Sequence, residues 1–324
     1  MATLKDIARQ TGFSVAVVSR ALNPRPDQHA RVSEATRRLL MQTALKMGFR
    51  RNRMAEFMRR GGLPTVGVFL PAVANRLVAD LVFGISEVLA EEDLPLQIGF
   101  DNYVEGFRKF IRRNVDLAHS GIISYPALIA DPDVEKEVAA YRSKGGKVVL
   151  LNTSVRLDGV PVISIDDQHG GRLAAERLLA RRCVRFAVMG SYPDRKQGFQ
   201  QFLSAAKSKA CEFKNDASGL RALPRFCRQA SPSRPVGIFA VTDMLALRVL
   251  RALSGTSLQV GRDVMLIGYD DLDMISEITP SLTTLHQPFR EEGRLAARKL
   301  IHMISGAQES SVSILPHLVI RESA

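Results

Sequence analysis

Cysteine is scarce and tryptophan is missing in this sequence of 324 residues. The three cysteines, Cys183, Cys211 and Cys227, are odd in number and show no CxxC spacing, which argues against a disulfide framework and against a zinc site. The six histidines are scattered, so we expect no metal and no cofactor. No apolar run approaches the length of a membrane span, and the first residues do not resemble a signal peptide. The sequence therefore predicts a cytoplasmic protein without a membrane partner.

The motifs of several enzyme classes are missing too. The sequence contains no GxGxxG turn, no Walker A phosphate loop, no GxSxG nucleophile elbow and no HExxH metal motif. Because each of these chemistries needs its residues at a fixed spacing, we expect that the chain is not an enzyme.

Positive charge is present but unevenly distributed. The formal net charge is +12, in a chain whose 46% hydrophobic and 24% charged residues are ordinary for a globular protein. Residues 1–62 contain 13 Lys and Arg against 4 Asp and Glu, a net charge of +9, which leaves only +3 for the rest. Such a charge is compatible with a solvated basic surface, but at one end of a chain it favours binding to phosphate.

The first residues have the layout of two short helices joined by a tight turn. Thr3 can cap the first helix, with Asp6 three residues later completing a capping box. Gly12 suits the left-handed end of that helix, and Ser14 can cap the second. A third helix is expected from Ser33 to about Met47. This arrangement predicts a helix-turn-helix.

The second helix has one apolar face and one face of small and polar residues. The apolar face contains Val18, Ala21 and Leu22. The other face contains Ala16, Ser19, Arg20 and Asn23. A short helix that presents small residues, a serine, an arginine and an asparagine suits the DNA major groove.

After Gly61-Gly-Leu-Pro64, which marks a boundary, short apolar strands alternate with amphipathic helices. The strand candidates are residues 65–70, 94–100, 121–125, 147–152, 161–165, 185–190, 236–241 and 265–269. This alternation predicts parallel sheets covered by helices. The strands are too many for one ordinary sheet, so we expect two doubly wound lobes with a cleft between them. The region of residues 207–234 looks shortened, which predicts a reduced sheet in the second lobe.

Several motifs resemble those of the lactose/galactose-repressor (LacI/GalR) family of bacterial transcription regulators over nearly the whole chain. In the head these are Leu4-Lys-Asp-Ile-Ala, Gly12-Phe-Ser-Val-Ala, Val18-Ser-Arg20-Ala-Leu-Asn23 and Val32-Ser-Glu-Ala-Thr-Arg37. In the body they include Val66-Gly-Val-Phe-Leu-Pro71, Thr242-Asp-Met-Leu-Ala246, Ile267-Gly-Tyr-Asp-Asp271 and Leu282-Thr-Thr-Leu-His-Gln-Pro288. The resemblance implies an α/β protein with an all-α helix-turn-helix head and a periplasmic-binding-protein-like body of two doubly wound lobes.

The expected domains follow from this resemblance. They are a DNA-binding head over residues 1–50, a hinge helix and linker over 51–62, and an effector-binding and dimerisation body over 63–324. Lobe 1 is expected over about 63–163 and 290–324, and lobe 2 over about 164–289.

In the head the resemblance implies a set of DNA contacts. Val15 and Ala16 would make the apolar contacts that set operator sequence, unless they merely fill the helix. Arg20 would bind a guanine edge, and Ser19 and Asn23 would position the DNA backbone. Thr3 and Ser14 complete the set expected in the head.

In the hinge, the resemblance places an apolar wedge for the minor groove at Met58, beside Ala55. Asn52 and Arg53 are the other DNA contacts expected there. Such a short helix would form mainly when two protomers meet on DNA, so we expect a homodimer or a dimer of dimers on a pseudo-palindromic operator. The alternative is a linker with an incidental methionine.

For the body, the resemblance implies an effector site between the lobes, in which Arg195 and Asp270 orient a sugar-like molecule or a nucleoside. Each of the two could instead form an ordinary surface or inter-lobe ion pair. Thr242, Asn75 and Asp101 are further candidates. Sugar stacking would need Phe83, Tyr192 or Phe289, because the family's aromatic pair after Asn75 is missing.

Three departures in and near the head affect DNA binding. Val17 replaces a threonine, Arg51 replaces a proline, and the loop after Asn23 is about four residues longer than is usual. The expected function is a repressor controlled by a small-molecule effector. The alternatives are an effector-independent regulator and a solute-binding protein of the periplasmic type.

Overall fold

The computed structural model describes residues 2–22, 32–49, 63–73, 76–116 and 119–324, and these residues fall into two compact units. The head extends to Leu63 and the body from Pro64 to Ala324. No helix in the described ranges is long and apolar enough to cross a membrane.

In the described part of the head, three helices begin where the sequence predicts. They are α1 (Leu4–Thr11), α2 (Val15–Ala21) and α4 (Glu34–Lys46), capped by Thr3, Ser14 and Ser33. The Thr3–Asp6 capping box is formed, and Gly12 adopts the left-handed φ of 72°. A small core of six buried side chains holds the three helices together: Ile7, Ala8, Val18, Ala21, Leu40 and Ala44.

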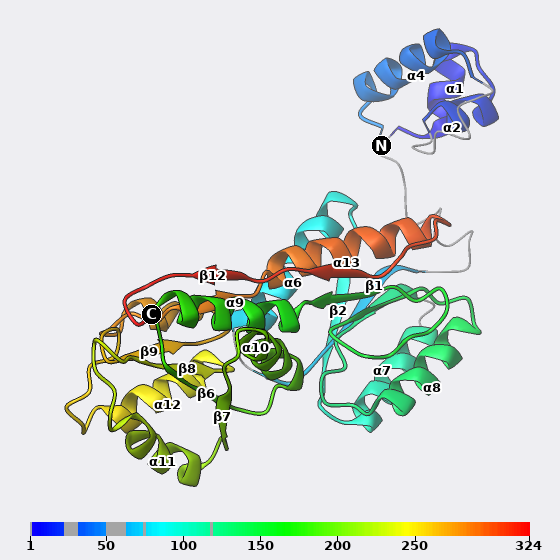
Figure 1. The fold of residues 1–324 in the computed structure, drawn as a ribbon. Coiled ribbons are helices and arrows are strands. Elements are labelled where there is room, and N and C mark those ends of the chain that lie inside the picture. The colour runs from blue at the N-terminus through cyan, green and yellow to red at the C-terminus, as the bar shows by residue number, and fades with distance from the viewer. Residues whose placement is uncertain (1, 23–31, 50–62, 74–75, 117–118) are drawn as a thin grey trace. The chain divides into compact units, whose positions relative to one another are not determined.

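Lobe 1 is a six-stranded sheet with helices on its faces (Figure 1). The strand order is β11-β5-β4-β3-β1-β2. The strands are β1 (Leu63–Leu70), β2 (Leu96–Phe100), β3 (His119–Ser124), β4 (Val148–Leu151), β5 (Val162–Ile165) and β11 (Val312–Ile314). The helices are α6 (Arg76–Glu91), α7 (Val104–Asp116), α8 (Asp131–Arg142) and α13 (Phe289–Ile304). The pairings β1–β2, β3–β4, β4–β5 and β5–β11 are parallel, as the α/β alternation predicts.

Lobe 2 is a parallel four-stranded sheet in the order β7-β6-β8-β9. The strands are β6 (Arg185–Met189), β7 (Ala210–Phe213), β8 (Val236–Ala240) and β9 (Val264–Ile267). The helices are α9 (Asp167–Ala180), α10 (Pro193–Ala205), α11 (Ala217–Cys227), α12 (Asp243–Leu253) and the short 3-10 helix η1 (Asp273–Ser276). The sheet is smaller than that of lobe 1, in line with the expectation of a reduced sheet, although β7 and α11 were not among the predicted elements.

The chain end departs from the expected lobe boundaries. Residues 290–324 were assigned to lobe 1, but only α13 and β11 pack there. β12 (His317–Val319) pairs antiparallel with β10 (Thr284–His286) and packs on α9. Ser323 then bonds to the backbone of Leu266 in β9, and Arg177 of α9 donates to the backbone oxygen of Ala324. The last residues therefore belong to lobe 2, and Figure 1 shows this red segment running back along α9.

Glycines permit two close helix crossings. In lobe 1, a Cβ added to Gly293 of α13 would overlap the carbonyl oxygen of Leu81, and one added to Gly84 of α6 would overlap that of Arg290. In lobe 2, a Cβ added to Gly171 of α9 or to Gly198 of α10 would likewise overlap a backbone oxygen of the opposite helix. The α9–α10 crossing places Arg195 next to the start of α9, and the α6–α13 crossing fixes the residue before Gly293, which is Glu292.

We expect Gly293→Ala to lower the free energy of unfolding by about 1–3 kcal/mol, because the added methyl forces α6 and α13 apart. Urea denaturation followed by circular dichroism measures the change. Gly255→Ala is the matched control, since a Cβ there meets nothing within 4 Å. Equal stabilities for the two variants would show that the crossing tolerates a side chain.

Candidate functional site

The second helix of the head, α2, presents a mixed surface to solvent. The hydroxyl of Ser14 accepts from the backbone N–H of Val17 at 3.3 Å, which fixes the helix start. Val18 and Ala21 are buried, as predicted. Ala16 and Ser19 are exposed, and Val15 is 41% exposed.

Arg20 is the candidate for reading a base. It is half-buried in the last turn of α2 and forms no ion pair with any residue that the structure describes. Its guanidinium is thus available for an external acceptor. Val17, which stands where the family has a threonine, packs against the head core, so an apolar contact replaces the hydroxyl.

The other predicted DNA contacts are placed as follows. The hydroxyl of Thr3 is engaged with Asp6 in the cap of α1. Several candidates lie outside the described residues: Asn23, Asn52, Arg53, Ala55, Met58 and, in the body, Asn75.

In the body, the side chain of Arg195 is the centre of a buried polar cluster. Only 5% of the residue is exposed, and its guanidinium lies 4.3 and 3.7 Å from the ring centroids of Tyr192 and Tyr269. Nη1 donates to the backbone oxygen of Val241 at 2.8 Å, and Nη2 donates to Oε1 of Gln287 at 3.2 Å. Residues from α10 and from the carboxyl ends of strands in lobe 2 therefore surround one cation.

Two carboxylates neutralise this cation. Oδ1 of Asp270 lies 3.3 Å from Nη1 of Arg195, and Oδ1 of Asp167 lies 3.1 Å from its Nε, without hydrogen-bond alignment. Burial lowers the pKa of Arg195, but Asp167 and Asp270 outweigh that effect and the net pKa is raised. The predicted pair is therefore in direct contact. It is a buried ion pair within lobe 2, and neither a surface pair nor an inter-lobe pair.

Asp270 is held in a strained conformation. Its φ is 124°, a region that side chains rarely adopt and that recurs at functional sites. Its Oδ1 accepts from Nε2 of Gln287 at 2.7 Å, and its backbone N–H donates to Leu285. Burial raises the pKa of Asp270 to about 7, and the positive charge of Arg195 opposes this rise.

A second buried acid, Glu292 in α13, lies where lobe 1 meets this cluster. It has no exposed surface. Its Oε2 accepts from Nδ2 of Asn152 at 3.1 Å, whereas its Oε1 has no hydrogen-bond partner among the described residues. Burial raises the pKa of Glu292 to about 8, and repulsion from Asp167 adds to the rise. Tyr125, after β3, is close enough to both Glu292 and Arg195 for each to affect its pKa, which burial raises.

The remaining effector candidates have local roles. The hydroxyl of Thr242 caps α12 by accepting from the N–H of Leu245 at 3.2 Å. Oδ1 of Asp101 accepts from the two N–H groups that follow it, and among the described residues no hydrogen bond or ion pair joins Asp101 to the Arg195 cluster. Among the rings proposed for stacking, Phe289 lies 6.3 Å from Tyr125, whereas Phe83 is 57% exposed on α6.

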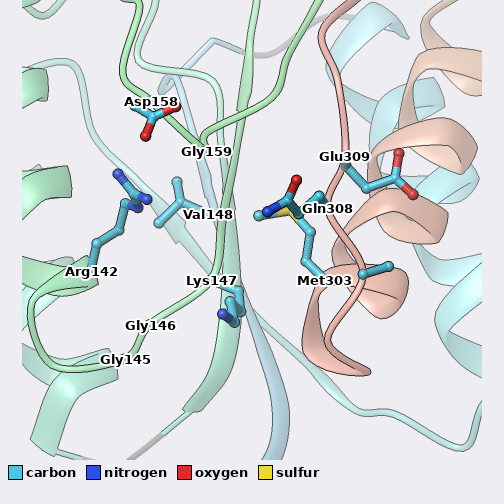
Figure 2. Close-up of a pocket in the computed structure, with 11 residues that line it drawn as sticks. Arg142, Gly145, Gly146, Lys147, Val148, Asp158, Gly159, Met303, Gln308 and Glu309 are labelled. Carbon is cyan, nitrogen blue, oxygen red and sulfur yellow. The ribbon is translucent and has the colours of Figure 1, made fainter.

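A pocket of about 470 Å³ lies at the opposite, amino-terminal edge of the lobe 1 sheet (Figure 2). Arg142 and Asp158 lie on one side of it and Gln308 and Glu309 on the other, with Lys147 at the start of β4. None of the predicted effector residues lines it. Within the described residues, no group of three His, Cys, Asp or Glu side chains could hold a metal ion.

The sequence interpretation missed several members of the cluster, namely Tyr125, Asn152, Asp167, Tyr269, Gln287 and Glu292. Five of them follow the end of a strand within two residues, where polar residues of an α/β sheet gather, so a systematic search of strand ends would have found them. Glu292 gave no such signal, because it lies in a helix beside another glutamate.

We expect Glu292→Gln to stabilise the protein, increasingly so as the pH rises from 5 to 8. The pKa of Glu292 is raised from an ordinary value of 4.5 to about 8, so the folded protein retains a proton that the unfolded chain releases. The stability that this proton contributes is complete below pH 4.5 and is lost as the pH rises to about 8. The gap between variant and parent should widen by roughly 3 kcal/mol over that range.

Urea denaturation at pH 5, 6.5 and 8 measures this gap. Glu291→Gln, at the exposed neighbouring glutamate, is the control and should follow the parent. Parallel pH profiles for parent and Glu292→Gln would mean that Glu292 is ionised in the folded protein.

Two family models match the chain. The model described as "Bacterial regulatory proteins, lacI family" matches residues 3–52, and the model described as "Periplasmic binding protein-like domain" matches residues 175–324. The first covers the described head helices, and the second covers α10, the segment after β9 and α13, which supply Arg195, Asp270 and Glu292.

Relatives and solved structures match over the whole chain. The ribose operon repressor of Escherichia coli is 27% identical, and the match covers 100% of both chains. The probable HTH-type transcriptional repressor ExuR of Bacillus subtilis is 26% identical, and the match covers 100% of this chain and 98% of that relative. The lac repressor dimer bound to operator and an anti-inducer has a TM-score of 0.69 at 23% identity, covering 99% of this chain and 98% of that one. The cellobiose complex of the regulator CelR has a TM-score of 0.69 at 22% identity, with both chains covered completely. The chain is thus similar to bacterial regulatory proteins of the lacI family in its head and to periplasmic-binding-protein-like domains in its body.

Proposed function

We propose that this protein is a transcriptional repressor that binds a pseudo-palindromic operator as a dimer and responds to a small molecule bound between the lobes of its body. The observation that carries the proposal is α2, a capped helix that presents Val15, Ala16 and Ser19 to solvent in a segment of net charge +9. Beside them lies Arg20, which forms no ion pair with the described residues. The proposal also places the chain in the cytoplasm, where operator DNA lies.

The residues of α2 that reach solvent offer two kinds of contact to DNA bases. Val15 and Ala16 can contact a thymine methyl, and Arg20 can donate two hydrogen bonds to a guanine edge. The positive charge of the head supplies the affinity for phosphate that is independent of sequence. The proposed hinge contacts are Asn52, Arg53, Ala55 and Met58, with Met58 as a wedge in the minor groove of the bound dimer.

The effector is proposed to be a sugar or a related polyol. One relative is a ribose operon repressor and one structural neighbour is a cellobiose complex, and the Arg195–Asp270 pair offers the charged and hydrogen-bonding groups that orient hydroxyls. Asp101, Thr242 and Asn75 are proposed to lie at the margin of the same site. Arg76 of lobe 1 forms an ion pair with Asp273 of lobe 2. A ligand that changes the orientation of one lobe relative to the other must therefore alter this contact.

An effector-independent regulator is the second candidate. It is favoured by one observation, namely that Nη1 and Nη2 of Arg195 already have internal hydrogen-bond partners and its charge is paired with Asp167 and Asp270. A rise in melting temperature with any small molecule would exclude it. The helix-turn-helix head argues against a periplasmic-type solute-binding protein.

The test of the proposal is selection of bound duplexes from a random DNA pool by the full-length protein, at low and at moderate salt. Enrichment of one palindrome supports a dimeric repressor. Failure to enrich any sequence, at both salt concentrations, would contradict the proposal.

We expect Arg20→Ala to weaken binding to the selected operator by about 1–3 kcal/mol and to relax the preference at one base position, because a bidentate contact is lost. Fluorescence anisotropy with operator and single-base variants measures both effects. Lys46→Ala, at an exposed residue in the last turn of α4, removes the same charge and should leave the base preference unchanged. An unchanged preference in Arg20→Ala would place the reading residue elsewhere in α2.

A further inference from the structure

Glu292 combines complete burial with an incomplete set of hydrogen bonds. Its Oε1 has no partner among the described residues, while its Oε2 is bonded to Asn152. A buried acceptor without a partner costs folding free energy, and native proteins keep few of them. Oε2 alone is enough to hold Asn152. The local structure therefore gives no reason for burying Oε1 without a hydrogen-bond partner.

The location of Glu292 supplies a reason. It lies at the junction of the lobes, close enough to Asp167 of lobe 2 and Tyr125 of lobe 1 for charge interactions with both. The helix crossing at Gly293 fixes it there, since α13 cannot move away from α6 without losing that contact. A rigidly held, unsatisfied oxygen at this place suits a bound donor group.

The charges around it indicate which donors fit. The buried cluster has one cation, Arg195, already paired with Asp167 and Asp270. The other cation between the lobes, Arg76, is paired with Asp80 and Asp273. Carboxyls therefore already neutralise both of these cations, which leaves neither as a free counter-charge for a ligand anion, and Glu292 would repel such an anion once it ionised.

We infer that Glu292 belongs to the effector site and selects a neutral or amine-bearing polyol, whose hydroxyl or ammonium group donates to Oε1, against sugar acids and sugar phosphates. This inference rests on the proposed function and names the chemical class of its effector. Asn152 is a positioning residue in this account, because it holds the carboxyl through Oε2 and leaves Oε1 free.

The test is isothermal titration of the full-length protein with matched sugars. The probes are glucose, glucosamine, glucuronate and glucose 6-phosphate, together with ribose, ribose 5-phosphate and cellobiose. We expect binding among the neutral and amino sugars and at least about tenfold weaker binding in Glu292→Leu, because a hydrogen bond to a buried carboxyl is lost. Glu292→Gln, which keeps an acceptor oxygen, should retain more of the binding of a neutral sugar, and Glu291→Leu should bind as the parent does.

Three results would overturn the inference. These are tighter binding of an acid or a phosphate than of its neutral counterpart, unchanged binding in Glu292→Leu, and failure of every probe to bind the parent chain. The operator selection is carried out without sugar. A palindrome enriched by a protein that binds none of the probes would therefore retain the repressor proposal and remove this one.

Discussion

The buried guanidinium of Arg195 is the interaction on which the functional part of the body depends. A cation that is 5% exposed is tolerable only because two carboxylates, a backbone oxygen, an amide oxygen and two aromatic rings surround it. These partners come from the starts of α9 and α10 and from the segments that follow β8, β9 and β10. The cluster therefore ties together segments of lobe 2 that are far apart in the sequence, and it holds Asp270 in a conformation that it would not adopt alone.

Close helix crossings make this arrangement possible. Gly171 and Gly198 let α9 and α10 approach until Arg195 reaches Asp167, and Gly84 and Gly293 do the same for α6 and α13 beside Glu292. The cost of burying charge at the junction of the lobes appears in the raised pKa values of Asp270 and Glu292, about 7 and about 8. Perturbed carboxyls of this kind recur at binding sites, because the groups are placed for a ligand as well as for stability.

Much of the head could be predicted from sequence, because its signals are local. Thr3, Ser14 and Ser33 cap helices through bonds that span three residues, and Gly12 ends a helix by its own backbone freedom. The strands β1 to β6, β8 and β9 were found for a similar reason, since buried parallel strands are continuous apolar runs, whereas β7, β10, β11 and β12 were not predicted. β12 was misplaced because three residues do not reveal which lobe they pair with. Glu292 was missed because Glu291 and Glu292 look alike in sequence, and only the packing of Gly293 on α6 decides which of them is buried.

In the proposed mechanism, a small molecule bound in the body changes the affinity of the head for operator DNA. Its most direct test is the affinity of the full-length protein for its selected operator, measured by fluorescence anisotropy with and without a saturating polyol that binds the protein. A regulator of this design should show a change of about fivefold or more, since coupling between two sites is typically 1–3 kcal/mol. The same affinity with and without the bound sugar would contradict the account.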